Sequence, residues 1–376
     1  MLRMELDKLP DMETHALILT GVRRCGKSTL VSQFLKERHV NFLYLNFEDP
    51  RLYEFELKDF TKLDEYIQKS KIRVLAFDEI QVIDQWERYI RQKVDQRFRV
   101  ILTGSNASML SRELGTKLTG RQISRELFPF SFEEFCQFRK EKKSKISAST
   151  YLETGGFPEY VVSGNQEILT QLFNDILVRD IAARHGIRDI RSLQRLALYL
   201  ITNISKPVSA SNLKSLINLG ATSTILEHMS YLEDAYLLFF IPKFSYSLRA
   251  QAINPRKVYA VDTGLVHVNS LSFNDDHGRK LENMVFLHLR RSYHDISYFS
   301  EKGECDFVVS EKGKVSKCIQ VCYHLNPDNQ DRELNGLFEA LEFFSMDTGW
   351  IITLDQKDKF ERNGKTILAV PVYEWA

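Results

Sequence analysis

The sequence lacks the features that mark disulfide-rich, zinc-binding or membrane-spanning proteins. It has only five cysteines in 376 residues, with no CxxC pair and no cysteine-histidine spacing typical of zinc ligands. No run of about 18 apolar residues occurs, and no apolar segment with a cleavage site follows the N-terminus. We therefore expect a cytoplasmic protein with reduced thiols and no membrane-spanning helix.

The sequence also lacks an excess of charge of either sign. Its 51 Lys and Arg residues balance 50 Asp and Glu residues, which leaves a net charge of +1. The field of the whole molecule is weak, so contact with nucleic acid would have to rest on local basic patches. Global charge neither supports nor excludes DNA binding. A chain of 376 residues exceeds what one hydrophobic core usually organises, so we expect two to four domains.

A glycine-rich loop near the N-terminus lies between an apolar segment and an amphipathic one. The stretch HALILTGVRRCGKSTLVSQFL predicts a strand at 16–20, a loop, and a helix with its apolar residues on one face. The loop reads GxxxxGKS, in which backbone amides hold phosphates, Lys27 reaches the β- and γ-phosphates, and Ser28 binds Mg²⁺. ATP and Mg²⁺ are the expected cofactors. The predicted nucleotide-binding residues are Gly21, Val22, Arg23, Arg24, Cys25, Gly26, Lys27, Ser28 and Thr29.

Two further apolar segments end in polar residues. RVLAFDEIQ ends in a Walker B pattern, in which Asp78 would hold Mg²⁺ through water and Glu79 would polarise the attacking water. RVILTGSN ends in Ser105 and Asn106, either of which is a candidate sensor of the γ-phosphate. With FLYLNFED, these segments predict an α/β fold with a doubly wound parallel sheet and a site at the carboxyl ends of the strands.

Two arginines are candidates for stabilising transition-state charge from a neighbouring subunit. Arg121 follows a glycine in a predicted loop and is a candidate arginine finger, with a surface arginine as the alternative. Arg179 is a weaker candidate, for which a salt bridge on a helix face is the favoured interpretation. Sequence alone does not place either side chain.

The middle of the chain is predicted to hold a helical lid at 131–190 and a winged helix at 191–265. The lid is interrupted by TGGFPEYV. The second region reads as helices with a turn at Leu219-Gly220, followed by two strands. Its third helix, from Thr222, would bury Ile225, Met229 and Leu232 and turn outward Thr222, Ser223, Thr224, Glu227, His228 and Tyr231. That face has no Arg or Lys, so a protein-packing module remains the alternative to DNA binding.

The C-terminal region at 266–376 has the α-β-β-β-α-β order of a restriction-endonuclease-like core. In active members, a helix Glu, a strand Asp and a further acid hold Mg²⁺, and a lysine two residues on orients water. Glu282 and Asp306 occupy the first two positions, but Gln320 and Cys322 stand at the last two. We therefore predict a nuclease-like fold that is catalytically inactive. Residual activity from Glu282 and Asp306 alone is the minor alternative.

A set of motifs across nearly the whole chain carries a family resemblance. GVRRCGKSTL, FDEIQ, ILTGSN, LTGR, FPFSFEEF, GGFPEY, VYAVDTGL, LENMVFLHLRR and CDFVV together resemble prokaryotic AAA-type ATPases with a winged helix and a C-terminal PD-(D/E)XK domain of undefined role. Many members of that family read E-V-K where this chain has Gln320-Val321-Cys322. The resemblance implies an ATPase core at 1–130, ATP hydrolysis, a homo-oligomer with nucleotide sites at subunit interfaces, and association with nucleic acid.

Two functional hypotheses follow. The first is an ATP-driven motor or remodeller that associates with DNA, including branched or junction DNA, through its winged-helix and nuclease-like domains. The second is a nucleotide-dependent oligomeric switch that recognises a protein partner. The first is the preferred hypothesis, because three modules common in DNA-associated proteins occur in one chain. The second is the alternative, supported by the neutral net charge and by the absence of basic residues on the third helix.

Overall fold

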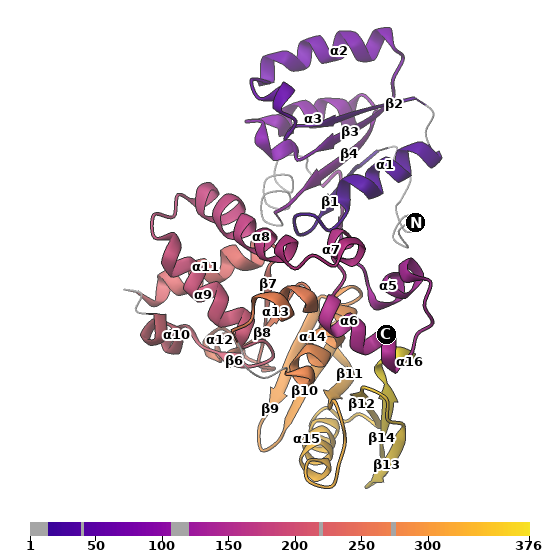
Figure 1. Ribbon diagram of the computed structural model, residues 1–376, viewed down its shortest axis with the longest axis vertical. Helices are drawn as coiled ribbons and strands as arrows, with labels where there is room; N and C mark the ends of the chain where they lie inside the picture. The colour runs from indigo at the N-terminus through magenta and orange to yellow at the C-terminus, as the bar shows by residue number, and fades with distance from the viewer. Residues whose placement is uncertain (1–13, 39–40, 107–119, 218–220, 272–275) are drawn as a thin grey trace. The chain divides into compact units, whose positions relative to one another are not determined.

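The computed structural model describes residues 14–38, 41–106, 120–217, 221–271 and 276–376. The chain forms two compact units (Figure 1). Unit 1 runs to Phe128 and also includes Asp234–Tyr236, and unit 2 comprises Pro129–Glu233 and Leu237–Ala376. The predicted turn at Leu219-Gly220 lies outside the described residues.

Unit 1 is built on a five-stranded sheet in the order β2-β3-β4-β1-β5, in which every neighbouring pair is parallel. This confirms the α/β fold with a parallel sheet that the sequence predicts. The last strand, β5, was not predicted, because QISRE alternates polar and apolar residues only weakly. The strands are β1 (Ala16–Thr20), β2 (Phe42–Asn46), β3 (Val74–Asp78), β4 (Arg99–Gly104) and β5 (Gln122–Glu126).

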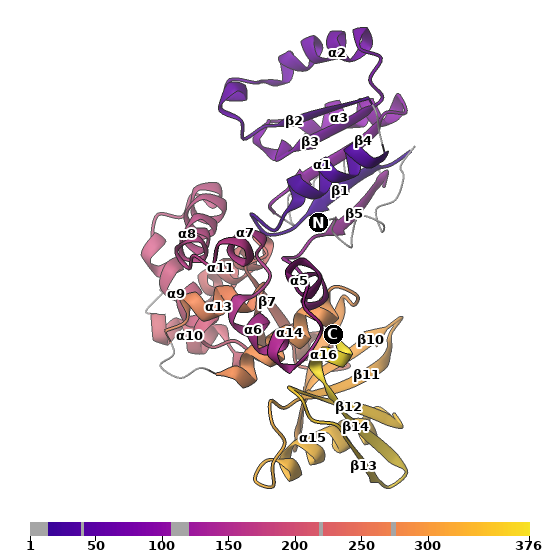
Figure 2. The same ribbon diagram turned by 45° about the vertical axis from the view of Figure 1, so that its right-hand side comes forward.

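Helices cover the sheet of unit 1 (Figure 2). Apolar residues of α2 and α3 form one core with alternate residues of the strands, including Ile18, Phe77 and Leu102. Successive side chains of a strand point to opposite faces, so this core lies on one face of the sheet. No residue of α1 belongs to it, although α1 has buried apolar residues, so α1 covers the other face. The helical segments are α1 (Lys27–Arg38), η2 (Pro50–Leu52), η3 (Leu57–Asp59), α2 (Phe60–Lys69), η4 (Ile80–Val82) and α3 (Trp86–Asp95).

Unit 2 begins with a run of helices, as the sequence predicts for this region. Ser131 and Ser144 each start a helix with a capping box, in which the serine and the residue three positions later satisfy each other's backbone N–H groups. The helices are α5 (Phe132–Arg139), α6 (Lys145–Thr154), α7 (Pro158–Ser163), α8 (Glu167–Asp175), the π-helical η5 (Ile176–Ala183) and α9 (Ile190–Thr202).

A small antiparallel sheet in the order β6-β8-β7 follows, together with α11 and the three short helices α10, α12 and α13. Helix α11 buries Ile225, Met229 and Leu232, as the sequence predicts. His228 was predicted to face outward, but it is buried, because it lies one helical turn from Ile225 and next to Met229. The elements are β6 (Pro207–Val208), α10 (Ala210–Ile217), α11 (Thr222–Asp234), β7 (Leu238–Pro242), α12 (Leu248–Ile253), β8 (Arg256–Ala260) and α13 (Thr263–Asn269).

The C-terminal part of unit 2 contains a mixed six-stranded sheet in the order β13-β14-β12-β11-β10-β9. Helix α15 packs across its central strands (Figure 1). The α-β-β-β-α-β order predicted from sequence is present, and the hairpin of β13 and β14 and helix α16 extend it beyond the prediction. The elements are α14 (His277–Arg290), β9 (Asp295–Ser300), β10 (Glu304–Glu311), β11 (Lys314–Val321), α15 (Gln330–Phe343), β12 (Thr348–Thr353), β13 (Asp358–Arg362), β14 (Lys365–Pro371) and α16 (Val372–Trp375).

Candidate nucleotide site

The loop between β1 and α1 has the backbone conformation of an anion-binding turn. Gly21, Arg24 and Gly26 all have positive φ angles, of 150°, 62° and 102°. A Cβ at Gly21 would overlap the carbonyl oxygen of Leu127, so only glycine fits there. The thiol of Cys25 donates to the same carbonyl at 3.3 Å, which fixes the back of the loop. The loop therefore leads directly into the N-terminus of α1, where backbone N–H groups and the helix dipole favour phosphate.

Lys27 is the buried cation of this site. Its Nζ donates to the carbonyl oxygens of Gly21 at 2.9 Å and Val22 at 3.1 Å, and lies 3.8 Å from Oε1 of Glu79. These contacts place the ammonium inside the loop, beside the Walker B residues. Ser28 and Thr29 follow on the exposed side of the first turn of α1. The predicted motif residues Lys27, Ser28 and Glu79 therefore lie at one end of the sheet.

Asp78 is held at the end of β3 by two hydroxyl groups. Thr103 donates to its Oδ1 through a very short hydrogen bond, and Tyr44 donates to its Oδ2 at 2.6 Å. Sequence reasoning missed Tyr44 and Thr103, because both lie within apolar strand segments. Burial, and then the hydrogen bond with Asp78, raise the pKa of Tyr44 above its ordinary value, so it acts as a donor at neutral pH. Outer hydrogen bonds of this kind orient a carboxylate toward a cation.

Glu79 follows Asp78 in a left-handed backbone conformation, with φ 53° and ψ 40°. Its backbone N–H donates to Oγ1 of Thr103 at 3.1 Å, so the same hydroxyl group positions both acidic residues. Its Oε2 accepts a hydrogen bond of 2.5 Å from Nε2 of Gln81. The left-handed turn directs the Glu79 carboxylate toward Lys27 rather than along the strand.

Ser105 and Asn106 stand just beyond β4, the strand that lies between β3 and β1. Both are 2% exposed. Within the described residues, Oγ of Ser105 has no hydrogen-bond partner. A buried hydroxyl group without a partner is uncommon and indicates a missing polar ligand. The residues of this site thus fit a phosphate-bearing nucleotide with Mg²⁺, which the loop amides, Lys27, Ser28 and Asp78 would hold.

The remaining predicted residues of this unit lie around or away from the site. Arg23 pairs with Glu48 at 2.9 Å beside the loop. The guanidinium of Arg121 pairs with Asp95, and its carbonyl oxygen accepts from the N–H of Ala16 at the first residue of β1. Arg121 therefore lies at the opposite end of β1 from the loop and does not reach the site of its own subunit. Its predicted role at a neighbouring subunit stays a prediction.

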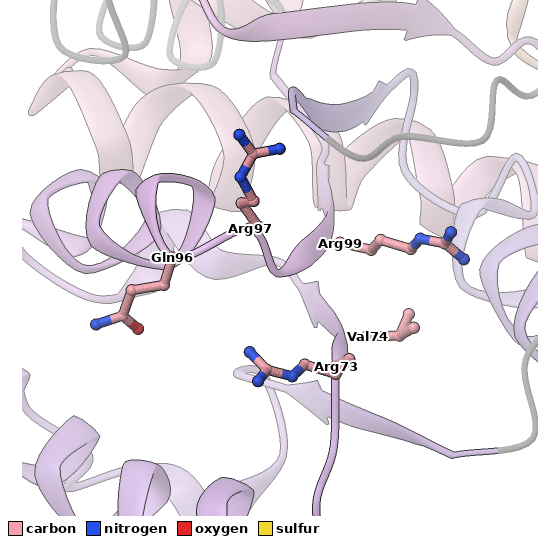
Figure 3. Close-up of a pocket in the computed structure, with 5 residues that line it drawn as sticks. All are labelled: Arg73, Val74, Gln96, Arg97 and Arg99. Atoms are coloured by element: carbon pink, nitrogen blue, oxygen red, sulfur yellow. The ribbon is translucent and has the colours of Figure 1, made fainter.

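A second feature of unit 1 is a pocket of about 500 Å³ lined by Arg73, Val74, Gln96, Arg97 and Arg99. Figure 3 shows Arg73 and Arg97 in the turns that precede β3 and β4, and Arg99 at the first residue of β4, with their side chains extending in different directions. These turns lie at the amino ends of the strands, away from the nucleotide site. The ring of Phe98 supports Arg73, whose guanidinium carbon lies 5.1 Å from the ring centroid. The pocket therefore presents positive charge on a chain with little net charge.

The predicted nuclease-like residues in unit 2 also lie together. Glu282 of α14 and Asp306 of β10 both contact the ammonium of Lys257, and the backbone N–H of Asp306 donates to Oε1 of Gln320 at 3.0 Å. Cys322 lies at the rim, where Nδ2 of Asn329 approaches its sulfur at 3.6 Å. Burial and Glu333 raise the pKa of the Cys322 thiol to about 11, so the thiol carries no charge at neutral pH.

Two protein families match separate parts of the chain. The family described as "AAA domain" matches residues 13–136, and the family described as "Domain of unknown function (DUF8612)" matches residues 145–276. The uncharacterized protein MJ1544 of Methanocaldococcus jannaschii is 32% identical over 96% of this chain and 87% of its own length. The chain belongs to the same family as MJ1544. An uncharacterized protein of Haemophilus influenzae is 30% identical over 83% of each chain.

The match to the AAA domain family indicates a P-loop ATPase domain over residues 13–136, which include Lys27, Asp78 and Glu79. Among solved structures, a signal transduction ATPase with numerous domains and a tetratricopeptide repeat sensor, from Pyrococcus horikoshii, is 13% identical with a TM-score of 0.28. The match covers 74% of this chain and 42% of that one. A TM-score this low carries no argument about function. In the part of the chain that the structure describes, no helix has both the length and the apolarity needed to cross a membrane.

Proposed function

We propose that this protein hydrolyses ATP with Mg²⁺ at the site formed by the loop, Asp78 and Glu79. The observation that carries the proposal is the position of the Glu79 carboxylate, 3.8 Å from the Lys27 ammonium and anchored through Thr103 to Asp78. Phosphoryl transfer depends mainly on positioning and on electrostatic stabilisation, which this arrangement supplies.

Each residue has a distinct part in the proposed reaction. Lys27 would exchange the carbonyl oxygens of Gly21 and Val22 for phosphate oxygens, and the loop amides would hold the remaining phosphate charge. Ser28 and Asp78 would hold Mg²⁺, which supplies charge neutralisation when bound. Glu79 would orient the attacking water and accept its proton. Ser105, with its unpartnered hydroxyl group, and Asn106 would sense the γ-phosphate.

The proposal extends to assembly and domain organisation. Arg121 cannot reach its own subunit's site, so it would stabilise transition-state charge at the site of a neighbouring subunit in a homo-oligomer. The proposed domains are the ATPase core at 1–130, a helical lid at 131–190, a winged helix at 191–265 and an inactive restriction-endonuclease-like domain at 266–376. The order of helices and strands in unit 2 supports this division.

Association with DNA is the first candidate for the purpose of hydrolysis, and the arginine pocket favours it. Arg73, Arg97 and Arg99 line one pocket at the amino ends of β3 and β4, at the end of these strands opposite the nucleotide site. Guanidinium groups bind phosphates through paired hydrogen bonds, and backbone phosphates dominate the affinity of most DNA-binding proteins. A local patch of this kind is what a chain with a net charge of +1 needs for DNA binding.

A nucleotide-dependent switch that recognises a protein partner is the second candidate, and helix α11 favours it. Its exposed residues include Ser223, Leu226, Glu227 and Ser230, and the helix has no Lys or Arg. Tyr231 stacks on His185 with ring centroids 3.6 Å apart, so it is engaged within unit 2. An exposed leucine on a face without positive charge suits a protein surface better than a DNA groove.

The ATPase proposal is tested by steady-state hydrolysis and ATP-binding assays on Lys27→Ala. Removing the ammonium should lower turnover by about 100-fold or more, because a buried charge that faces the phosphates is lost. Lys36→Ala is the matched control, since Lys36 lies on the same helix but is exposed. Equal turnover in wild type and Lys27→Ala would contradict the proposal.

The two partner hypotheses are separated by the double variant Arg73→Ala/Arg97→Ala. Binding to linear, single-stranded and branched DNA is measured against salt concentration, with ATPase stimulation in parallel. The DNA hypothesis expects weaker binding and a salt slope smaller by about 2, because each duplex phosphate contact contributes about 0.9. Arg88→Ala/Arg91→Ala on exposed positions of α3 is the control. No binding to any DNA form, together with a nucleotide-dependent change in oligomeric state, would favour the protein-partner switch.

A further inference from the structure

The nuclease-like part of unit 2 contains a buried lysine that sequence reasoning did not connect with it. Lys257 lies in β8, outside the nuclease-like core, and is 2% exposed. Its Nζ lies 2.7 Å from Oδ1 of Asp306, 2.6 Å from Oε1 of Glu304 and 3.4 Å from Oε1 of Glu282. Three carboxylates thus share one ammonium: those of Glu282 and Asp306 are largely buried, whereas that of Glu304 is half-exposed.

The surrounding hydrogen bonds fix the carboxylates around that ammonium. Tyr259 donates to Oε1 of Glu282 at 2.7 Å, and the N–H of Val321 donates to Oδ2 of Asp306 at 2.9 Å. Although burial lowers the pKa of Lys257, Asp306, Glu282 and Glu304 outweigh it and raise that pKa well above its ordinary value. Its ion pairs hold the Lys257 ammonium among these three carboxylates.

Gln320 and Cys322 replace the acid and the lysine expected on the third strand, and the Gln320 amide already has hydrogen-bond partners at both ends. Gln320 accepts from the N–H of Asp306 with Oε1, and it donates with Nε2 to Oε2 of Glu333 at 2.6 Å. Its side-chain oxygen is thus engaged by the backbone. Over the described ranges, no group of three or more histidine, cysteine and acidic side chains is arranged to hold a metal ion.

Burying two or more carboxylates without a nearby cation is very costly, so a site of this composition needs a positive charge. A divalent metal ion meets that need in a working nuclease site. Here an ammonium from a different strand lies between the same carboxylates. Lys257 falls within the residues matched by the domain of unknown function, whereas Glu282, Glu304 and Asp306 follow it in the chain.

We propose that Lys257 is the resident cation of this site, that it takes the place of a divalent metal ion, and that the C-terminal domain therefore binds none. The ion-pair cluster then joins β8 to α14 and β10 without any metal. Lys257, 65 residues before Cys322 in the chain, supplies the positive charge that a lysine at position 322 would have carried. The inference stands apart from the proposed ATPase function, whose residues lie in unit 1.

The first test is the thermal unfolding of full-length Lys257→Met in EDTA and in MnCl₂, without nucleotide. Removing the ammonium should lower the unfolding midpoint in EDTA, and Mn²⁺ should restore part of it by entering the freed carboxylate cluster. Adding Asp306→Asn to the variant should abolish the recovery. In a protein that keeps Lys257, Asp306→Asn should not change the shift of the unfolding midpoint caused by Mn²⁺. Lys280→Met is the matched control, because Lys280 is also a buried lysine of unit 2 and its Nζ contacts Nδ1 of His267.

A second measurement uses proteins that keep Lys257, so it holds even if Lys257→Met fails to fold. The number of bound Mn²⁺ ions is counted by electron paramagnetic resonance in wild type and in Asp306→Asn. Equal numbers in the two proteins support the proposal. One ion fewer in Asp306→Asn would overturn it, as would a folded Lys257→Met that gains no Mn²⁺-dependent stability. All these measurements are made without nucleotide and on variants of unit 2, which separates them from the ATPase site of unit 1.

Discussion

The hydroxyl group of Tyr44 donates a hydrogen bond of 2.6 Å to Oδ2 of Asp78, across two neighbouring parallel strands. We expect Tyr44→Phe to keep the fold and to raise the Mg²⁺ concentration needed for half-maximal ATPase activity by about 10-fold. Mutation of such outer partners typically lowers metal affinity by about 10- to 100-fold. The measurement is ATPase activity titrated with MgCl₂. Tyr66→Phe, an exposed tyrosine on α2, is the control and should behave as wild type.

Glu79→Gln is expected to separate nucleotide binding from hydrolysis. The amide keeps the size of the side chain and its contact with Gln81, but it cannot accept a proton from water. Turnover should fall by about 100-fold or more, while ATP affinity stays within a few-fold of wild type. Single-turnover hydrolysis and equilibrium binding of labelled ATP provide the two readouts. Glu65→Gln on exposed α2 is the control, and full activity in Glu79→Gln would remove Glu79 from the mechanism.

Gly156→Ala should destabilise unit 2, because an added Cβ would overlap the carbonyl oxygen of Phe130. The two backbones are held together there by the hydrogen bond from the N–H of Phe130 to the carbonyl of Gly156, at 2.7 Å. We expect a loss of about 2 kcal/mol or more in the free energy of unfolding, measured with urea.

Gly278→Ala provides the matched glycine control. It lies in α14, and among the described residues its Cβ would meet only Oδ1 of Asp276 within 4 Å, at 3.7 Å. Alanine favours a helix over glycine by about 1 kcal/mol, so this variant should be as stable as wild type or slightly more stable. Similar losses in both glycine variants would show that crowding at Phe130 is not the cause.

His288 is expected to make unit 2 less stable in mild acid. Burial, aided by Arg291 and Lys143, lowers its pKa to about 4. Its ring centroid lies 4.6 Å from that of Trp375. Because the folded-state pKa lies below the unfolded value of about 6.5, the stability it contributes is present above pH 6.5 and is lost as the pH falls toward 4.

The test compares the free energy of unfolding at several pH values in wild type and His288→Leu. Wild type should lose about 2 kcal/mol more than the variant between pH 6.5 and pH 4, since leucine has no proton to bind. His294→Leu, at an exposed position in the loop after α14, should retain the wild-type pH dependence. Identical pH profiles for wild type and His288→Leu would rule out this role of His288.

The nucleotide loop and the parallel sheet could be predicted from the sequence because each depends on local order. A GxxxxGKS loop needs its glycines, Lys27 and Ser28 at fixed spacing, and buried parallel strands appear as continuous apolar runs. The contact of Tyr44 with Asp78 could not be predicted in this way. It depends on the register of two strands that are more than 30 residues apart, in which Asn46 pairs with Asp78.

Lys257 shows the same limit more clearly. In KVYAVD it reads as a charged residue near the start of a strand, whereas its partners Glu282 and Asp306 lie on α14 and β10. A lysine between Arg256 and Val258 gives no sign in the sequence that its own side chain is buried. One signal was available: two acids expected to bind a metal lacked their third ligand and their lysine, so a cation from elsewhere in the chain was needed. The prediction that His228 faces outward was wrong, because the buried face of α11 is wider than the apolar stripe of Ile225, Met229 and Leu232.

The left-handed backbone at Glu79 lowers the stability of unit 1 at the residue that is proposed to activate water. A residue other than glycine at φ 53° is strained by about 1 kcal/mol, and asparagine or glycine would adopt that conformation more easily. Glu79→Gly or Glu79→Asn should therefore melt at a higher temperature than wild type while being unable to activate water. In the proposed mechanism, unit 1 therefore tolerates backbone strain at a residue whose carboxylate lies beside Lys27.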